Sequence, residues 1–327
     1  MTVKSRLLKL LEQHKGETMS GERLAEELTC TRAAVWKAVK ALREEGYTID
    51  AGPNKGYMLA RDSNRLSVEA LRLYLNAPQA VIKIYDQVNS TNQCAKKAAV
   101  SGEAGHGSFV MALEQTAGRG RRGRAFYSPR DAGLYLSVIL EPEETLKESL
   151  LITTAAAAAV YKAVRNVCGV SLDIKWVNDL YRDGRKVCGI LTEAVTDFEN
   201  GDIQFAVVGI GLNLYLVKDE LPSELAGVAG AVFDSREEAE TADRNRLAAE
   251  IVNVLLEETK DLKLSREYVE QNIVPGREIE IIDGERSRHA KALSVCEDGR
   301  LLVEEQDGRQ SRLSYGEVSV CIKGEND

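Results

Sequence analysis

The sequence predicts an α+β protein of three parts: a small helical N-terminal domain, a central mixed α/β domain and a small all-β domain at the C-terminus. The first observation behind this prediction is the length, because 327 residues are about twice the usual size of one domain. The second is a helical hydrophobic period in residues 3–44, and the third is a period of two in residues 278–322. The domain boundaries that we expect are 1–62, a linker over 63–80, 81–273 and 274–327.

Composition indicates a globular protein of the cytoplasm. Hydrophobic residues make up 44% and charged residues 29%, so the chain can bury a core large enough to offset its ordering entropy. The most apolar stretch, 150–160, is shorter than the ~20 residues that span a bilayer, and we expect no membrane partner. The six cysteines are dispersed and only three histidines are present, which indicates reduced thiols and not a zinc cluster or a disulfide framework.

The N-terminal part reads as three helices followed by a β-hairpin. Leucines on one helical face form the first helix, Ser20 can cap a second, and Thr31 can cap a third. Two short alternating runs, 47–50 and 56–59, follow around a Gly-Pro-Asn turn. Three helices and a hairpin are typical of a winged helix-turn-helix domain, which we predict for residues 1–62.

The third predicted helix, residues 31–43, has basic side chains and no acidic one. In a major groove the first residues of such a helix reach base edges while Lys and Arg contact phosphates. An ordinary solvated face is the alternative; helix length, turn and wing together favour DNA. Residues 1–62 carry a net charge of +2 and residues 63–327 a net charge of −10, so only the N-terminal part suits a polyanion. The predicted DNA-contacting residues are Thr31, Arg32, Trp36, Lys37, Lys40 and Lys55.

Strand-like and helical patterns share residues 81–273, and they do not alternate strictly, which favours α+β over a doubly wound sheet. The predicted strands are 80–85, 109–114, 134–140, 171–176, 187–195 and 203–216, and the predicted helices are 91–100, 144–167 and 243–262. In the C-terminal part, short alternating runs are separated by Asp-Gly turns. These runs predict a small β-barrel or sandwich.

The most unusual string is Gly-Arg-Gly-Arg-Arg-Gly-Arg at residues 118–124, between two predicted strands. Its guanidinium groups repel one another and its glycines remove rigidity, so we expect the loop to order when an anion binds. An RNA-binding Arg/Gly tract is the alternative, but such tracts repeat over long segments. Neither a P-loop nor a complete G-x-G-x-x-G fingerprint is present. The string therefore predicts a phosphate or carboxylate clamp.

Further short motifs accompany this loop. They are Ser90-Thr91-Asn92, Gln115, Lys175-Trp176-Val177-Asn178-Asp179, Lys186 to Leu191, and Gly209 to Asn213. In order and spacing, and with the Arg/Gly string, they resemble biotin protein ligases fused to an N-terminal operator-binding domain, the bifunctional biotin operon repressors. The resemblance covers essentially the whole chain.

The resemblance implies an ATP-dependent ligase that forms biotinoyl-5′-AMP and passes biotin to a lysine of the biotin carboxyl carrier protein of acetyl-CoA carboxylase. It also implies Mg²⁺ with the ATP, operator DNA as a partner, repression of the biotin operon, a homodimer when biotinoyl-AMP is bound, and an SH3-like C-terminal barrel. The residues suit this reaction, because a carboxylate that attacks a phosphorus needs positive charge around it. No protein nucleophile is needed, since the substrate carboxylate and the acceptor amine fill that role.

The resemblance also assigns roles position by position. The catalytic residues would be Lys186, Arg119 and Arg121. The biotin site would comprise Ser90, Thr91, Asn92, Gln115, Gly118, Arg119, Arg121, Phe126, Lys186, Gly189 and Gly211. The nucleotide site would comprise Arg121, Arg122, Asn178, Asp179, Lys186 and Asn213, with Asp179 helping to place Mg²⁺. One departure is Val177, where the family motif usually has Pro; we expect its freer φ to loosen that turn.

Two other functions remain open at this stage. The chain could be a transcription factor whose central domain only senses a small acid, with the Arg/Gly loop kept for binding. It could instead be a lipoate or octanoate ligase, which shares the architecture. The Arg-rich loop favours biotin over these acids.

Overall fold

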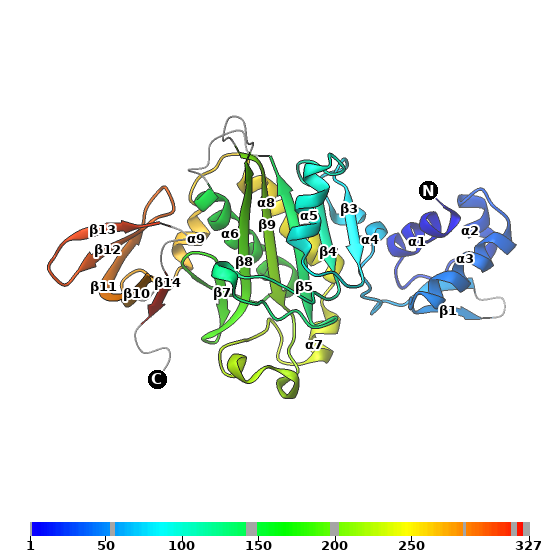
Figure 1. The fold of residues 1–327 in the computed structure, drawn as a ribbon. Coiled ribbons are helices and arrows are strands. Elements are labelled where there is room, and N and C mark those ends of the chain that lie inside the picture. Colours follow the sequence, from blue (N-terminus) through cyan, green and yellow to red (C-terminus); the bar gives the residue numbers. More distant parts are fainter. Residues whose placement is uncertain are drawn as a thin grey trace. The chain divides into compact units, whose positions relative to one another are not determined.

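The structure is a computed structural model that describes residues 2–52, 56–141, 149–196, 203–283, 286–314 and 319–322. The chain divides into two compact units. The first comprises Met1–Asn76 with Glu240–Ala249, and the second comprises Ala77–Ala239 with Glu250–Asp327. Figure 1 shows the order of their elements along the chain.

The first unit contains the predicted winged helix-turn-helix elements. They are α1 (Val3–Gln13), α2 (Gly21–Glu27), α3 (Arg32–Glu44), β1 (Ile49–Gly52) and β2 (Gly56–Leu59), and the two strands pair antiparallel. Ser20 Oγ accepts from the Arg23 amide at 3.1 Å, and Thr31 Oγ1 accepts from the Ala34 amide at 3.2 Å. Both helices therefore begin where the sequence predicted their caps.

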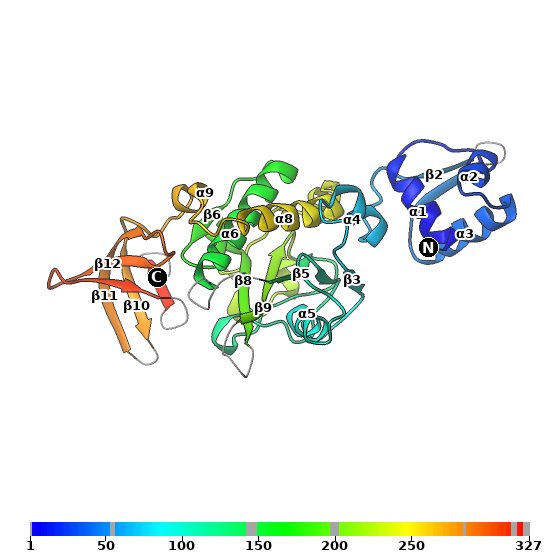
Figure 2. The ribbon, with the colours of Figure 1, turned by 90° about the horizontal axis from the view of Figure 1, so that it is seen from above.

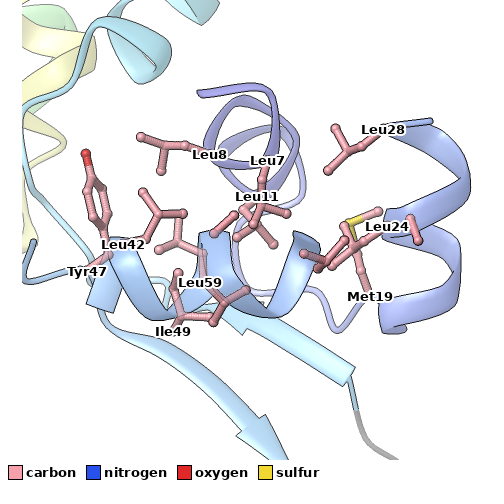
Figure 3. Close-up of a cluster of buried hydrophobic side chains, with 14 residues drawn as sticks. Leu7, Leu8, Leu11, Met19, Leu24, Leu28, Leu42, Tyr47, Ile49 and Leu59 are labelled. Carbon is pink, nitrogen blue, oxygen red and sulfur yellow. The ribbon is translucent and has the colours of Figure 1, made fainter. Parts of the chain in front are cut away.

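One apolar core holds these helices and the hairpin together. Figure 3 shows the side chains from every element meeting at its centre, where Leu7, Leu11, Leu24, Leu42 and Leu59 are fully buried. Burial of each large apolar side chain contributes about 1.5–3 kcal/mol, so this cluster stabilises the packing of the helices against the hairpin.

Residues 63–80, predicted as a linker, contain α4 (Val68–Tyr74). The segment is held to the start of α8 (Arg244–Glu258) by Asn245, which is 1% exposed. Asn245 accepts from the Ser67 amide at 3.0 Å and donates to the Arg65 carbonyl at 2.9 Å. Nearby, burial raises the pKa of Glu12 to about 6; the charge of Lys15 opposes that shift.

Within the described residues of the second unit, seven strands form one mixed sheet, here called the central sheet. Their order is β3-β4-β5-β9-β8-β7-β6. The strands are β3 (Ile82–Tyr85), β4 (Phe109–Ala112), β5 (Gly133–Leu140), β6 (Asp173–Lys175), β7 (Asp179–Arg182), β8 (Arg185–Thr196) and β9 (Ile203–Asn213). β3 and β4 pair in parallel and the other neighbours pair antiparallel, which confirms the mixed α and β character predicted for this part.

Helices cover both faces of the central sheet. Figure 2 shows α5 (Thr91–Val100) on one face and α6 (Ser149–Cys168) on the other. The alanines of α5 pack against β4, β5 and β9, and those of α6, residues 155–159, are almost completely buried. Small side chains let both helices approach the sheet closely, which explains the Ala-rich sequence. The remaining helices of the second half are α7 (Arg236–Thr241) and α9 (Arg266–Glu270).

The C-terminal part forms an antiparallel sheet of short strands in the order β13-β12-β11-β10-β14. They are β10 (Glu278–Asp283), β11 (Arg286–Val295), β12 (Leu301–Glu305), β13 (Gln310–Leu313) and β14 (Ser319–Ile322). Alternate residues such as Ile279 and Ile281 are buried, as the period of two predicted. The strands are confirmed, and their closure into an SH3-like barrel stays a prediction.

Several elements differ from the sequence prediction. The predicted strand 203–216 ends at Asn213, because the next amides leave the sheet and bind the Ala132 carbonyl. β7, α4, α7 and α9 were not predicted, since segments of four to seven residues are too short to show a clear period. Parts of three predicted elements lie outside the described residues. They are the hairpin tip at 53–55, the beginning of the predicted helix at 144–148, and residues 315–318 among the C-terminal strands.

Two general expectations can be examined directly. In the ranges that the structure describes, no helix is both long enough and apolar enough to cross a membrane. The described cysteines Cys30, Cys94, Cys168, Cys188 and Cys296 are free thiols.

Candidate active site

The start of α5 brings the first predicted site residues together. Ser90, Thr91 and Asn92 are all at least 95% buried. Thr91 donates to Gln115 Oε1 both from its amide, at 2.9 Å, and from its hydroxyl, at 3.0 Å. Gln115 Nε2 in turn donates to Ser128 Oγ at 3.0 Å. The Gln115 side chain is thus oriented from both ends, although 24 residues separate it from Thr91.

A buried polar chain continues from Thr91 in the other direction. Ser137 Oγ lies 2.8 Å from Thr91 Oγ1 and 2.6 Å from Asn92 Oδ1. Asn92 Nδ2 donates to Glu193 Oε2 at 2.8 Å, and Lys96 Nζ lies 2.6 Å from Glu193 Oε1. Ser137, Glu193 and Lys96 were not predicted. One signal was available: Ser137 is a polar residue in the middle of the apolar strand β5, whose eight residues are all buried.

Glycines on β8 and β9 form a floor beneath Phe126. Gly189 and Gly211 are direct partners in the antiparallel pairing of the two strands. A Cβ on Gly211 would overlap the Phe126 ring, and one on Gly189 would lie 3.3 Å from both that ring and Lys186 Cε. Gly209 is equally constrained, since its Cβ would overlap the Asn92 carboxamide. Gly209 and Gly211 therefore have no room for a side chain, and at Gly189 the neighbours would have to move by a few tenths of an ångström.

Two basic side chains, Lys186 and Arg121, come a few residues before Gly189 and Phe126 in the sequence, and each contacts a polar side chain. Lys186 Nζ lies 2.7 Å from Asp179 Oδ1, and Arg121 donates to Asn178 Oδ1 at 3.1 Å. Asn178 is itself fixed, because its Nδ2 donates to the Ile190 carbonyl at 2.8 Å. Asp179 pairs with Gly189 across β7 and β8, so these contacts gather next to the glycine floor.

The Arg/Gly loop closes on itself through its backbone. The Phe126 amide donates to the Gly118 carbonyl at 2.9 Å, and the Gly120 amide donates to the Arg124 carbonyl at 2.7 Å. Gly118 lies tightly against this closure, where a Cβ would crowd the Phe126 carbonyl and Ser128. The structure brings Arg121 into the site, while the side chains of Arg119 and Arg122 are exposed. Ordering of the loop by an anion stays a prediction.

Asn213 is joined to the site by a segment that the sequence did not indicate, residues 228–232. The Lys186 amide donates to the Val228 carbonyl at 2.9 Å, and the Gly230 amide donates to the Lys186 carbonyl at 2.8 Å. Asn213 Nδ2 donates to the Gly230 carbonyl at 3.0 Å. Its Oδ1 is buried and has no hydrogen-bond partner among the described residues.

The turn at Val177 is supported by tertiary contacts. Val177 is completely buried, and its carbonyl accepts from the Tyr268 hydroxyl at 3.0 Å. The Trp176 indole donates to the Gly299 carbonyl at 2.9 Å, and the Trp176–Val177 peptide bond is cis. Contacts of Trp176 and Val177 thus hold the turn from both sides, and whether Val177 loosens it relative to a proline stays a prediction.

On the winged helix-turn-helix domain, the predicted DNA-contacting residues of α3 share one exposed surface. Arg32, Lys37 and Lys40 are exposed, and Trp36 is 56% exposed with Lys40 Nζ 6.0 Å from its ring centre. Thr31 is exposed as well, although its Oγ1 serves as the helix cap. Lys55 lies outside the described residues.

Comparisons with known proteins agree with this geometry. The Biotin/lipoate A/B protein ligase family matches residues 84–213, and an HTH domain family matches residues 3–58. A Bifunctional ligase/repressor BirA from Bacillus spizizenii is 32% identical over 316 residues, covering 94% of this chain and 95% of the relative. The protein of the same name from Escherichia coli is 31% identical over 327 residues, covering 98% and 97%.

A solved structure is also similar. It is the biotin protein ligase of Aquifex aeolicus in complex with biotin and ATP, which is 25% identical, has a TM-score of 0.58, and covers 74% of this chain and 99% of its own. With full-length relatives above 30% identity, the chain belongs to the biotin/lipoate A/B protein ligase family, among its bifunctional ligase/repressor members.

Proposed function

We propose that this protein activates biotin with ATP to biotinoyl-5′-AMP and transfers the biotinoyl group to a lysine of the biotin carboxyl carrier protein of acetyl-CoA carboxylase. One observation carries the proposal: a polar pair, Thr91 and Gln115, is linked through Ser128 to the Phe126 carbonyl, and the Phe126 ring lies on the glycine floor beside Lys186. That order of polar, flat apolar and cationic groups matches a ligand with a polar ring head, an apolar middle and a carboxylate end.

The first step joins two anions, so charge placement decides its rate. A biotin carboxylate oxygen forms a bond to the α-phosphorus of ATP, and the bond to pyrophosphate breaks. Lys186 and Arg121 are the cations at hand, and Asp179 and Asn178 hold them before the substrates arrive. Preorganised charge of this kind stabilises the transition state because no reorganisation is needed during the reaction. In the second step the acceptor amine attacks the acyl carbon and AMP leaves.

We propose that one carboxylate of the protein holds Mg²⁺ together with the ATP phosphates. Among the described residues, no group of three or more His, Cys, Asp and Glu side chains lies together as a metal site. Mg²⁺ is commonly held by one or two carboxylates together with substrate phosphates. Asp179, which also contacts Lys186 at 2.7 Å, would be the carboxylate that holds the ion. The ion would neutralise charge on the ATP phosphates.

We also propose that the protein represses the biotin operon, with α3 in the major groove of an operator. A single winged helix covers one half-site, and a net charge of +2 in residues 1–62 allows few phosphate contacts. Useful affinity therefore requires two copies at a fixed spacing, and we propose a homodimer that forms when biotinoyl-AMP is bound.

Pyrophosphate release tests the ligase proposal. The protein with Mg²⁺, ATP and biotin should release pyrophosphate and then label the carrier protein, whereas lipoate and octanoate should do neither. Biotin binding without pyrophosphate release would show a sensor and overturn the proposal, and so would faster activation of lipoate or octanoate.

Sedimentation and an operator mobility shift test the repressor proposal. Biotinoyl-AMP should raise both the dimer fraction and the operator affinity. If neither quantity changes with the ligand, the proposed coupling is wrong.

A further inference from the structure

The buried polar chain around Thr91 extends beyond the residues that would touch biotin. Glu193 lies on β8 and accepts from Lys96 at 2.6 Å and from Asn92 at 2.8 Å. Asn92 Nδ2 also donates to the Leu191 carbonyl at 3.3 Å. A carboxylate and a carbonyl both only accept, so the Asn92 amide can point in one direction: nitrogen toward β8 and oxygen toward Ser137.

The number of available protons then determines which group donates in each hydrogen bond of this buried polar chain. A serine hydroxyl has one proton, and Ser137, which is fully buried, must give it to Asn92 Oδ1 at 2.6 Å. Gln115 presents Oε1 to Thr91, because that oxygen accepts from the Thr91 amide at 2.9 Å. Neither Ser137 nor Gln115 is left with a proton for Thr91 Oγ1. The Thr91 hydroxyl donates to one of them, and neither of these two neighbours can donate to its lone pairs.

We infer that Glu193 is a positioning residue that sets the hydrogen-bond polarity of the head-group site, so that Thr91 Oγ1 accepts an N–H from the ligand. The inference rests on the proposed function and adds a residue that would not touch the ligand. A ligand with ring N–H groups, such as the ureido ring of biotin, satisfies the Thr91 oxygen. A ring without N–H donors leaves it unpaired, which is costly in a buried site.

The variant Glu193→Gln reverses the polarity. The positive charge of Lys96 attracts the oxygen of the new carboxamide and repels its NH₂ group, so the oxygen would turn toward Lys96 and the NH₂ group toward Asn92. Asn92 would then rotate, exchanging its 3.3 Å hydrogen bond to the Leu191 carbonyl for one that it donates to Ser137. The Ser137 proton would pass to Thr91 Oγ1. The Thr91 oxygen would no longer need a donor from the ligand.

The experiment compares biotin with its two N-methylated ureido isomers, using KM, kcat and dissociation constants. Relative to wild type, Glu193→Gln should weaken biotin about tenfold, the value of one net hydrogen bond, and change kcat less than about twofold. For the N-methylated isomer that wild type binds less tightly than biotin, Glu193→Gln should change the dissociation constant less than about threefold.

Two further variants separate polarity from structure. Lys96→Met leaves Glu193 as an acceptor for Asn92 and should keep the wild-type preference for biotin over the N-methylated isomer. The double variant Lys96→Met, Glu193→Gln should regain it, because the new carboxamide oxygen is then free to face Asn92. Glu258→Gln is the matched control, since Glu258 also pairs with a lysine, Lys162, at 2.7 Å but lies outside the site.

If Glu193→Gln does not fold, as judged by thermal melting, Asn92→Ala releases the Ser137 proton in the same way and should show the same loss. A folded variant that keeps the wild-type ratio between biotin and the methylated isomer overturns the inference alone. A wild-type protein that does not bind biotin overturns both the inference and the proposed function.

Discussion

The two units are built on different physical principles. The winged helix-turn-helix domain is organised by short-range patterns: caps at Ser20 and Thr31, and leucines that meet in one apolar core. The candidate active site is organised by polar contacts between residues far apart in the chain, such as Asn92 with Glu193, 101 residues away. An apolar core tolerates change wherever volume is kept, whereas a buried polar chain has one correct arrangement of donors and acceptors. Substitutions in the two regions should therefore differ in kind.

The largest expected effect is at Lys186, because the reaction depends directly on its charge. Lys186→Ala should slow biotinoyl-AMP formation by more than ~100-fold, the scale of losing one preorganised charge at a reacting centre. Single-turnover measurement with radiolabelled ATP checks this. Lys83→Ala is the control, since Lys83 pairs with Glu103 at the edge of the central sheet. Wild-type rates in Lys186→Ala would reduce Lys186 to a structural role.

The same small change, glycine to alanine, should give opposite results in the two regions. At Gly211 the new methyl group would overlap the Phe126 ring, and overpacking of ~1–3 kcal/mol should weaken biotin binding about 10- to 100-fold. At Gly21, at the start of α2, a Cβ makes only an ordinary contact of 3.4 Å with Tyr57, so Gly21→Ala should not lower stability. Calorimetric titration and thermal melting measure the two effects. Equal tolerance at both positions would contradict the close approach at Gly211.

A polar group buried in the first unit should respond to pH. Burial raises the pKa of Glu12 from 4.5 to about 6, so the folded state binds its proton more tightly than the unfolded state. The free energy of unfolding should therefore fall as pH rises from 4.5 to 6, by about 2 kcal/mol in all. Glu12→Gln should remove this slope and raise stability at pH 7, as measured by amide hydrogen exchange in α1. The exposed Glu26→Gln should keep the slope; an unchanged slope in Glu12→Gln would show that Glu12 is not its source.

The smallest effect is expected at a helix cap. Ser20→Ala removes the acceptor for the Arg23 amide and should lower the stability of the N-terminal domain by about 1 kcal/mol. Amide exchange in α2 measures the loss, and the biotin affinity should not change. A loss of biotin affinity would mean that the cap also supports the active site.

The contrast between short-range patterns and long-range polar contacts also explains which parts of the structure could be predicted from the sequence. The helices α2, α3 and α5 begin at the predicted residues, because a cap or a helical period is visible within a few positions. The residues that the resemblance placed in the site, such as Thr91, Gln115 and Lys186, have the contacts described above, and their roles toward biotin and ATP stay predictions. Glu193 and Ser137 were missed. Ser137 stands out as a polar residue in the apolar strand β5, but the sequence of neither strand indicates a partner on α5. The segment 228–232, which binds Lys186 and Asn213 through its backbone, has no motif at all.

The central claim is that α5, the Arg/Gly loop and strands β8 and β9 form one site for biotin. Isothermal titration of biotin into the protein, followed by the same titration with lipoate, tests it most directly. We predict saturable binding of one biotin per chain, weakened about 10- to 100-fold in Gly211→Ala, and no heat from lipoate at the same concentrations. Lipoate that binds as tightly as biotin and displaces it, or a biotin titration without heat or saturation, would contradict the account.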